Sequence, residues 1–410
     1  MTPSPHIQWI RSNRANLTSN LSAPEWEAFR QRLFPGDRIN LNPGTLGTPS
    51  TAILEAKHDF FENGLSAFPL GQYRQGRLSL RSARQRADSV FGVPGVAIAG
   101  GTTATVNLLL LALLGLSGRR GEPLRVLSSG HEHYGGLAGF ERHPGVDVSY
   151  LDDSRVGDPQ AVAELASSFD ILFLSQVTWT EGRVLPVEAI GEAMAQRGLD
   201  CWLMVDAAQS LGLLPPPVGV ADVVVGSGHK WLSLPQGTGF LWTSERVRQT
   251  LGGLNWSGEA LDGESAQARW EPAGGQDFSL YAGVDAGLEI IEAIGPSIMP
   301  KRSEYLAEYL AQTLSEHLTS EGVAHTLLPK PGGAAPGFLT LHFPDVDSYP
   351  IYDYMNSQGV HVKCIKKDLK GGRSLNALRF TVPYWESHRR LNKAIECVIA
   401  GMSTILAQGA

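Results

Sequence analysis

Between about residues 95 and 245, short runs of β-branched or apolar residues alternate with segments of helical periodicity. This alternation is typical of βαβ units, in which helices cover both faces of a parallel sheet. We therefore expect a large α/β domain with a mostly parallel, seven-stranded sheet. The expected strands lie at 96–100, 125–129, 146–151, 170–177, 201–206, 222–228 and 237–243.

The pattern changes after about residue 300. It predicts an amphipathic helix over 301–318, three strands, and a final helix from about His388. We expect a large domain over 41–295, a smaller α+β domain over 296–410 with a contribution from the N-terminal segment, and an N-terminal arm over 1–40. The arm should pack on the large domain or on a partner subunit. The three strands are expected at 337–343, 360–365 and 377–382.

Charge and cysteine content narrow the possible partners. The 410 residues carry a net charge of −7 without a dense basic run, which argues against a nucleic-acid partner. Three widely spaced cysteines argue against a disulfide framework and against a zinc cage, so we expect no metal and a reducing, cytoplasmic setting. The longest apolar stretch, 108–116, is about half a membrane span, so no membrane insertion and no targeting segment are expected.

Polar residues follow three of the expected strands, where open α/β sheets place their chemistry. Gly100 and Gly101 precede Thr102 and Thr103 at the start of an apolar helix, an arrangement suited to binding phosphate, although a Thr after a Gly turn also serves as a simple helix cap.

Asp206 ends the strand CWLMVD. A buried carboxylate there needs a cationic partner such as a protonated pyridine nitrogen, or it only caps the next helix. Lys230 follows a third apolar strand, together with Ser227 and His229. A desolvated lysine has the lowered pKa that Schiff-base formation requires, and Ser227 could bind phosphate.

The run VDAAQ followed by SGHKWL resembles the cofactor-lysine region of the class V aminotransferase family, whose members depend on pyridoxal 5′-phosphate (PLP). The resemblance extends from NLNPGTLG (40–47) to LRFTVPYW (378–385). It implies the PLP-dependent transferase fold of type I, PLP as the cofactor, a small-molecule amino-acid substrate, and a homodimer with the active site at its interface.

The resemblance also implies roles for single residues. Lys230 would form the internal aldimine and act as the base, Asp206 would lie under the pyridine nitrogen, and Gln209 would lie near the ring oxygen. His133 would stack on the cofactor, with Phe140 seven residues further on. The residues expected to hold the phosphate are Thr102, Thr103, Ser227 and His229.

Further positions concern the substrate and the second subunit. Arg379 would bind the α-carboxylate in bidentate geometry. Asn42, Gly44 and Thr45 would line the site, and Arg74 and Gln75 would enter the neighbouring site. Relatives have a Gly-Thr pair whose threonine reaches the partner's phosphate. Here the pair is Gly274-Gly275, and the Gly275 N–H could replace that hydroxyl. Trp179 replaces a small polar residue and either shapes the pocket or is core.

The resemblance implies an external aldimine and then a quinonoid, whose fate stays open. The run 175–190 is most similar to the isopenicillin N epimerase branch, so we expect a C–S lyase acting on a cysteine conjugate by β-elimination, or an epimerase. A class V aminotransferase is the alternative. Tyr281 or His133 could be a second base.

Three minor alternatives also stay open. They are a cysteine desulfurase, although Cys364 lies in an expected strand instead of a free loop, a serine hydrolase using Ser227 and Lys230 as Ser-x-x-Lys, and a non-catalytic binding relative.

Overall fold

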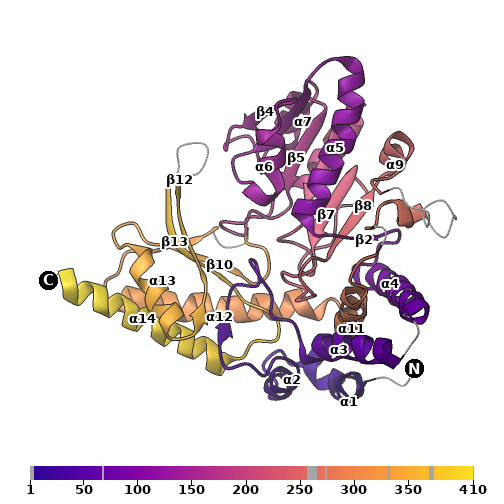
Figure 1. Ribbon diagram of the computed structural model, residues 1–410. Coiled ribbons are helices and arrows are strands. Elements are labelled where there is room, and N and C mark those ends of the chain that lie inside the picture. The colour runs from indigo at the N-terminus through magenta and orange to yellow at the C-terminus, as the bar shows by residue number, and fades with distance from the viewer. Residues whose placement is uncertain are drawn as a thin grey trace.

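The computed structural model describes residues 4–66, 69–255, 266–272, 275–329, 333–368 and 374–409. It consists of a large domain built on a seven-stranded sheet and a smaller domain that lies beside it (Figure 1).

The central sheet has the order β2-β8-β7-β6-β5-β3-β4. Strands β4, β3, β5, β6 and β7 run parallel, and β8 is antiparallel to both of its neighbours. All seven expected strands are present, and the mostly parallel α/β fold is confirmed. The strands are β2 (Ala97–Ala99), β3 (Leu124–Ser129), β4 (Val146–Leu151), β5 (Ile171–Ser175), β6 (Trp202–Asp206), β7 (Val223–Ser227) and β8 (Gly239–Thr243).

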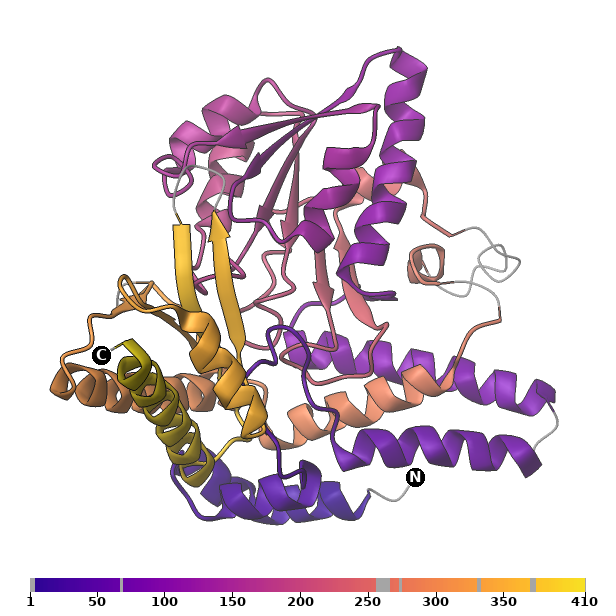
Figure 2. The same cartoon turned by 60° about the vertical axis from the view of Figure 1, so that its left-hand side comes forward.

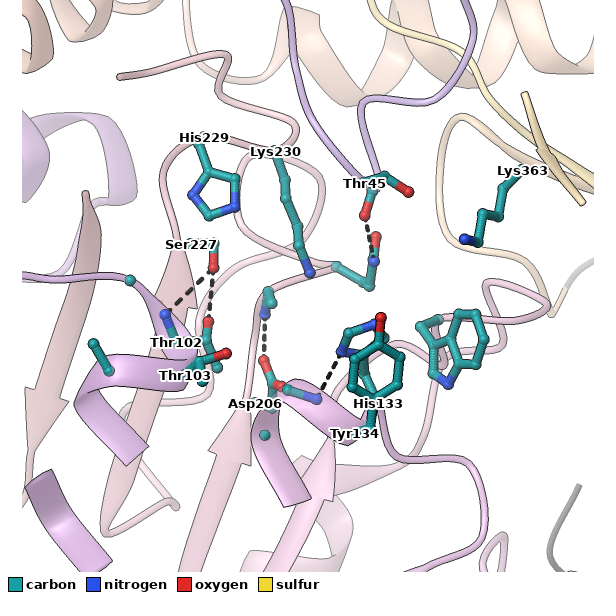
Figure 3. A pocket seen from close by; sticks show the side chains of 18 of the residues that line it. Thr45, Thr102, Thr103, His133, Tyr134, Asp206, Ser227, His229, Lys230 and Lys363 are labelled. Carbon is teal, nitrogen blue, oxygen red and sulfur yellow. Dashed lines mark hydrogen bonds between the residues drawn. The ribbon is translucent and has the colours of Figure 1, made fainter. Parts of the chain in front are cut away.

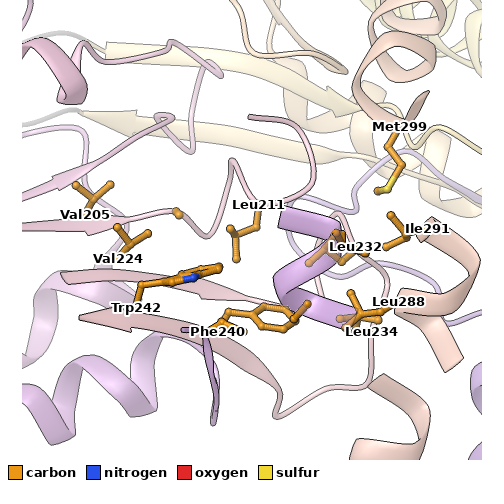
Figure 4. Packing of buried hydrophobic residues seen from close by; sticks show 14 of the residues in the cluster. Val205, Leu211, Val224, Leu232, Leu234, Phe240, Trp242, Leu288, Ile291 and Met299 are labelled. Atoms are coloured by element: carbon orange, nitrogen blue, oxygen red, sulfur yellow. The ribbon is translucent and has the colours of Figure 1, made fainter. Parts of the chain in front are cut away.

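Successive residues of each strand supply two cores, because side chains alternate between the faces of a sheet. On one face Met204 and Val223 pack under α5 (Thr102–Arg120), α6 (Tyr134–Arg142) and α9 (Glu245–Leu251). On the other face Val205 and Val224 pack with the helices α7 (Pro159–Ala166), α8 (Val187–Gln196) and α11 (Ser279–Ile294). Figure 4 shows this second core, where Leu288 and Ile291 of α11 approach the loop that follows β7.

The smaller domain has a four-stranded antiparallel sheet of order β12-β13-β10-β9, covered by three helices. The expected strand 360–365 is in fact two strands, because the chain leaves the β1–β11 ladder at Val362 and joins β13. The elements are β9 (Thr326–Leu328), β10 (Phe338–His342), β11 (Val360–His361), β12 (Lys363–Asp368), β13 (Ser374–Thr381), α12 (Ile298–Ser320), α13 (Ser348–Ser357) and α14 (His388–Gly409).

The N-terminal segment contacts both domains. Helices α1 (Pro5–Ser19) and α2 (Glu25–Leu33) bury Ile10 and Phe29 in the core of the large domain, whereas β1 (Ile39–Asn40) pairs with β11 of the smaller one. Helices α3 (Thr51–Ser66) and α4 (Pro69–Phe91) lie along α11 in a layer below the sheet (Figure 2). A short 3₁₀ helix spans Ala266–Arg269. The domain boundaries near 40 and 295 stay predictions.

The helices within the described ranges include none that combines the length and apolar character needed to cross a bilayer.

Candidate active site

A cavity of about 530 Å³ lies between the two domains, at the carboxyl ends of β6 and β7. This volume is in the range of small-molecule sites. Figure 3 shows its polar side chains converging from opposite walls. The lining residues are Gly44, Thr45, Gly100, Gly101, Thr102, Thr103, Ala104, His133, Tyr134, Gly135, Gly136, Trp179, Asp206, Ala208, Gln209, Ser227, His229, Lys230, Lys363 and Arg379.

The N-terminus of α5 forms one end of the cavity. Gly101 has φ of +87°, a value that favours glycine, and the turn aims the first backbone N–H groups of the helix at the cavity. The hydroxyl oxygens of Thr102 and Ser227 lie 2.9 Å apart (Figure 3). His229 has a buried Nδ1 atom without a hydrogen-bond partner among the described residues. This end can bind an anion.

Lys230 and Asp206 face each other across the middle of the cavity. Burial lowers the pKa of Lys230 to about 8, an effect that the charge of Asp206 opposes and the charge of Arg379 supports. Burial raises the pKa of Asp206, and Lys230 and the Ala208 N–H partly offset this rise. A lysine in this setting is partly neutral near physiological pH, so its amine can act as a nucleophile and as a base.

The loop between β1 and α3 closes over Lys230. The Gly47 N–H donates to the His229 carbonyl at 2.8 Å, and a Cβ at Gly47 would lie 2.2 Å from the Lys230 carbonyl oxygen. The Gln209 side chain donates to the Gly44 carbonyl at 2.7 Å and accepts from the Trp231 indole at 3.2 Å. Glycine at position 47 is therefore required by the close approach of two backbones.

Arg379 forms the wall opposite the anion-binding end. It is 1% exposed and donates to Asn42 Oδ1 at 2.9 Å, Thr45 Oγ1 at 3.2 Å and the Trp179 carbonyl. All three partners are neutral, and within the described chain no carboxylate forms an ion pair with it. Burial lowers its pKa to about 10, so the guanidinium stays charged and can bind a ligand carboxylate.

Three rings line the remaining side of the cavity. His133 caps α6, and its Nδ1 accepts from the Gly135 N–H at 3.0 Å. The Tyr134 and Trp179 rings contact His133 at centroid distances of 4.1 and 5.3 Å. Trp179 is 8% exposed and lines the cavity, and it also packs with Ile365 and Leu375 in an apolar cluster, so it is both pocket wall and core.

The family model for aminotransferase class V matches residues 41–367, which include the anion-binding turn, Asp206 and Lys230. This match spans most of the chain. The protein is a member of the class V aminotransferase family. This match confirms the family that the resemblance of the two sequence runs implied.

Curated relatives of this chain carry the names of different activities. Isopenicillin N epimerase of Streptomyces clavuligerus is 26% identical over 72% of this chain and 80% of its own length. A probable cysteine desulfurase of Methanothermobacter thermautotrophicus is 26% identical over 63% of this chain and 68% of its own.

Solved structures share the fold at lower identity. A variant of C-DES with glycine covalently linked to its PLP cofactor has a TM-score of 0.73 and 19% identity, over 90% of this chain and 98% of that one. The same protein, described as a cystine C–S lyase in complex with its product cysteine persulfide, gives 0.72 and 18%, over 89% and 98%.

Most of the residues predicted from the class V resemblance line this one cavity. Asn42 does not line it but orients Arg379, and Phe140 is buried in the core against Phe173. Tyr281 also lies outside the lining, where its hydroxyl donates to Gln276 and burial raises its pKa, so it is poorly placed to be a second base.

The positions predicted to act on a second subunit lie away from this cavity. Arg74 is exposed on α4, Gln75 lines a hollow between α1, α3, α4 and α11, and Gly275 is exposed before α11. Gly274 lies outside the described residues. Their roles stay predictions.

Three residues at or behind the cavity were not predicted from the sequence. Tyr134 and Lys363 line the cavity, and Glu132 is buried just behind it, where it accepts from the Ser129 hydroxyl at 2.6 Å and the Ser175 hydroxyl at 2.5 Å. Burial raises the pKa of Glu132 to about 7; the two serines oppose the rise, and the charge of Asp206 adds to it. Tyr134 and Glu132 could have been inferred from their position next to His133 in the sequence. Lys363 could not, because its place at the cavity depends on the register between β12 and β13.

The cysteines are all free thiols. Cys201 and Cys397 are buried, and burial raises the pKa of each. Cys364 lies within β12, as predicted. In the portion of the chain that the structure describes, no group of three or more His, Cys, Asp or Glu residues is arranged to hold a metal ion.

Proposed function

We propose that this protein is a PLP-dependent enzyme that acts at the α-carbon of an amino acid, with Lys230 as the residue that binds the cofactor covalently. The observation that supports this most is a single cavity with three features. It has an anion-binding turn at one end and a lysine of lowered pKa facing a buried carboxylate in the middle. At the other end it has an arginine that pairs with no carboxylate of the described residues.

The residues present fit PLP. Thr102, Thr103, Ser227 and His229 would hold its phosphate, and the buried unpaired Nδ1 of His229 is the atom that lacks such a partner. Asp206 would accept from the pyridine nitrogen, and His133 would lie against the ring. When bound, the cofactor supplies an electron sink for the charge that develops at the α-carbon.

The chain's own groups then have separate tasks. Arg379 binds and orients the substrate carboxylate through its planar guanidinium, which Asn42, Thr45 and Trp179 hold in place. Lys230, whose amine is partly neutral, takes the α-proton and can return it. The buried wall of Trp179 and the loop at 44–47 limit the access of water to this proton.

We propose β-elimination from a cysteine conjugate, or epimerisation, as the reaction, with transamination as the alternative. The epimerase relative and the lyase that shares the fold support this pair. A desulfurase is less well supported, because Cys364 lies in the β12 ladder and a mobile nucleophile needs a free loop. A Ser-x-x-Lys hydrolase is also poorly supported, since the Ser227 hydroxyl pairs with Thr102.

Product analysis in heavy water separates these reactions. Elimination from a cysteine conjugate releases a thiol, ammonia and pyruvate, epimerisation returns the amino acid with inverted configuration and deuterium at the α-carbon, and transamination yields a keto acid without free ammonia. We expect one of the first two, abolished in Lys230→Ala. Keto acid without ammonia would establish the transaminase, and no turnover of any amino acid would contradict the proposal.

We also propose a homodimer. Helices α3 and α4 expose four large apolar side chains, and a hollow of about 930 Å³ lies between α1, α3, α4 and α11. Clusters of exposed apolar residues on a folded protein mark interaction surfaces. The exposed side chains are Leu54, Phe61, Leu70 and Leu78.

A further inference from the structure

Lys363 is a second cation at the substrate end of the cavity. It is the first residue of β12 and pairs directly with Arg379 in the antiparallel β12–β13 ladder. Residues paired in this way project from the same face of a sheet, with Cβ atoms about 5 Å apart. In Figure 3 the Lys363 side chain extends into the cavity from the side opposite Thr102 and Ser227.

The surrounding packing fixes this orientation. Ile365, two residues along β12, packs with Trp179 and Leu375 in a small apolar cluster. Because alternate residues of a strand share a face, the same cluster places Lys363 beside Trp179, which is part of the cavity wall. A shift of register by one residue would turn Lys363 away and expose Ile365.

Neither cation has an anionic partner in the part of the chain that the structure describes. Among the described residues, Lys363 makes no hydrogen bond or ion pair, and the partners of Arg379 are neutral. Of the described residues that line the cavity, Asp206 is the only carboxylate, and it faces Lys230. Like charges placed directly opposite each other on a sheet are destabilising unless an anion neutralises them.

We propose that Lys363 binds a second acidic group of the substrate, so that the substrate is an amino acid whose side chain carries a carboxylate. This inference rests on the proposed function, which assigns Arg379 to the α-carboxylate. One cation would then hold the carboxylate common to all amino acids, and Lys363 would select those with a second negative charge.

Calorimetric binding to the protein as purified tests this assignment without turnover. The probes are unbranched dicarboxylates from succinate to pimelate, each compared with the monocarboxylate of equal carbon number. None of them carries an amine. We expect at least one dicarboxylate to bind about tenfold tighter than its monocarboxylate, the size expected for one charge-assisted contact.

Variants show whether Lys363 is responsible. Lys363→Met should remove the preference, and Lys363→Arg should keep it. Lys366→Met is the matched control, since Lys366 lies on the same strand but is exposed and paired with Asp347. Equal binding of both ligand series, or a preference that survives in Lys363→Met, would overturn the proposal.

The cofactor is measured separately in the same samples. If the protein holds no covalently bound PLP but the dicarboxylate preference depends on Lys363, the proposed function fails while the second anion site stands. If bound PLP is present and the preference is absent, only the anion site fails.

Discussion

At the scale of single residues, the burial of Lys230 determines how it can react. An amine must be unprotonated to capture an aldehyde, and burial lowers the pKa of this one to about 8. The neutral fraction therefore rises as the pH increases through about 8, whereas an unperturbed lysine would require a pH above about 10. We expect the rate of PLP capture by the apoprotein to follow this curve.

Brief exposure of the apoprotein to PLP at each pH, followed by borohydride trapping and mass measurement, gives that rate. Lys230→Ala supplies the background. A midpoint near the value for a solvated lysine would contradict the burial of the amine.

Glu132 gives a prediction in which the measured quantity falls, instead of rising, with increasing pH. Its pKa in the folded protein is about 7, above the ordinary value of 4.5, so the folded state binds more protons between these values. The contribution of Glu132 to the free energy of unfolding should thus fall as the pH rises from about 5 to about 7. The variant Glu132→Gln serves as the reference, because glutamine does not titrate.

Denaturant unfolding of both proteins over this range should show the free energy of unfolding of the wild type falling, relative to that of Glu132→Gln, by about 1–3 kcal/mol with rising pH. A difference that stays constant would mean that Glu132 is not buried as described.

Site residues were predictable where a single short stretch of sequence contained both the apolar strand and the polar residue at its end. Asp206 ends an apolar strand, and Thr102 and Lys230 follow one, so all three lie at the carboxyl ends of strands, as expected. Lys363 could not be found in this way, because its place beside Arg379 depends on the register between β12 and β13. Register is fixed by packing against distant residues such as Trp179, which no local pattern encodes.

At the scale of elements, the loop between β1 and α3 carries a sharp prediction. Gly47→Ala would place a Cβ 2.2 Å from the Lys230 carbonyl oxygen. The loop or the lysine turn must then move, so we expect a loss of about 1–3 kcal/mol in stability and lower cofactor content.

Gly36→Ala is the matched control, since a Cβ there meets no atom within 4 Å. Thermal unfolding and bound PLP per chain are the two measurements. Wild-type values of both in Gly47→Ala would show that the loop does not press on the lysine turn.

Elements such as β5, β7 and β8 follow from composition, because these strands are buried on both faces and read as short apolar runs. The division of 360–365 into β11 and β12 does not, since both halves have the same apolar alternation. The sheet change at Val362 arises from β1, a segment more than three hundred residues away.

At the scale of the whole molecule, we expect a dimer formed through α3 and α4. Leu70, Arg74 and Leu78 lie on one face of α4, and both leucines are 54% exposed. Leu78→Asp should shift the protein toward monomer in light scattering after size exclusion. Tyr349→Asp, an equally exposed apolar position on α13 in the other domain, should not. A wild-type monomer at micromolar concentration would exclude this interface.

The central claim is that Lys230 holds PLP covalently in the cavity between the domains. The most direct test is the absorbance spectrum of the purified protein, before and after borohydride, with Lys230→Ala in parallel. We predict a visible band in the wild type that borohydride removes and that the variant lacks. A protein that stays colourless after addition of PLP, or a variant with the same borohydride-sensitive band, would contradict the account.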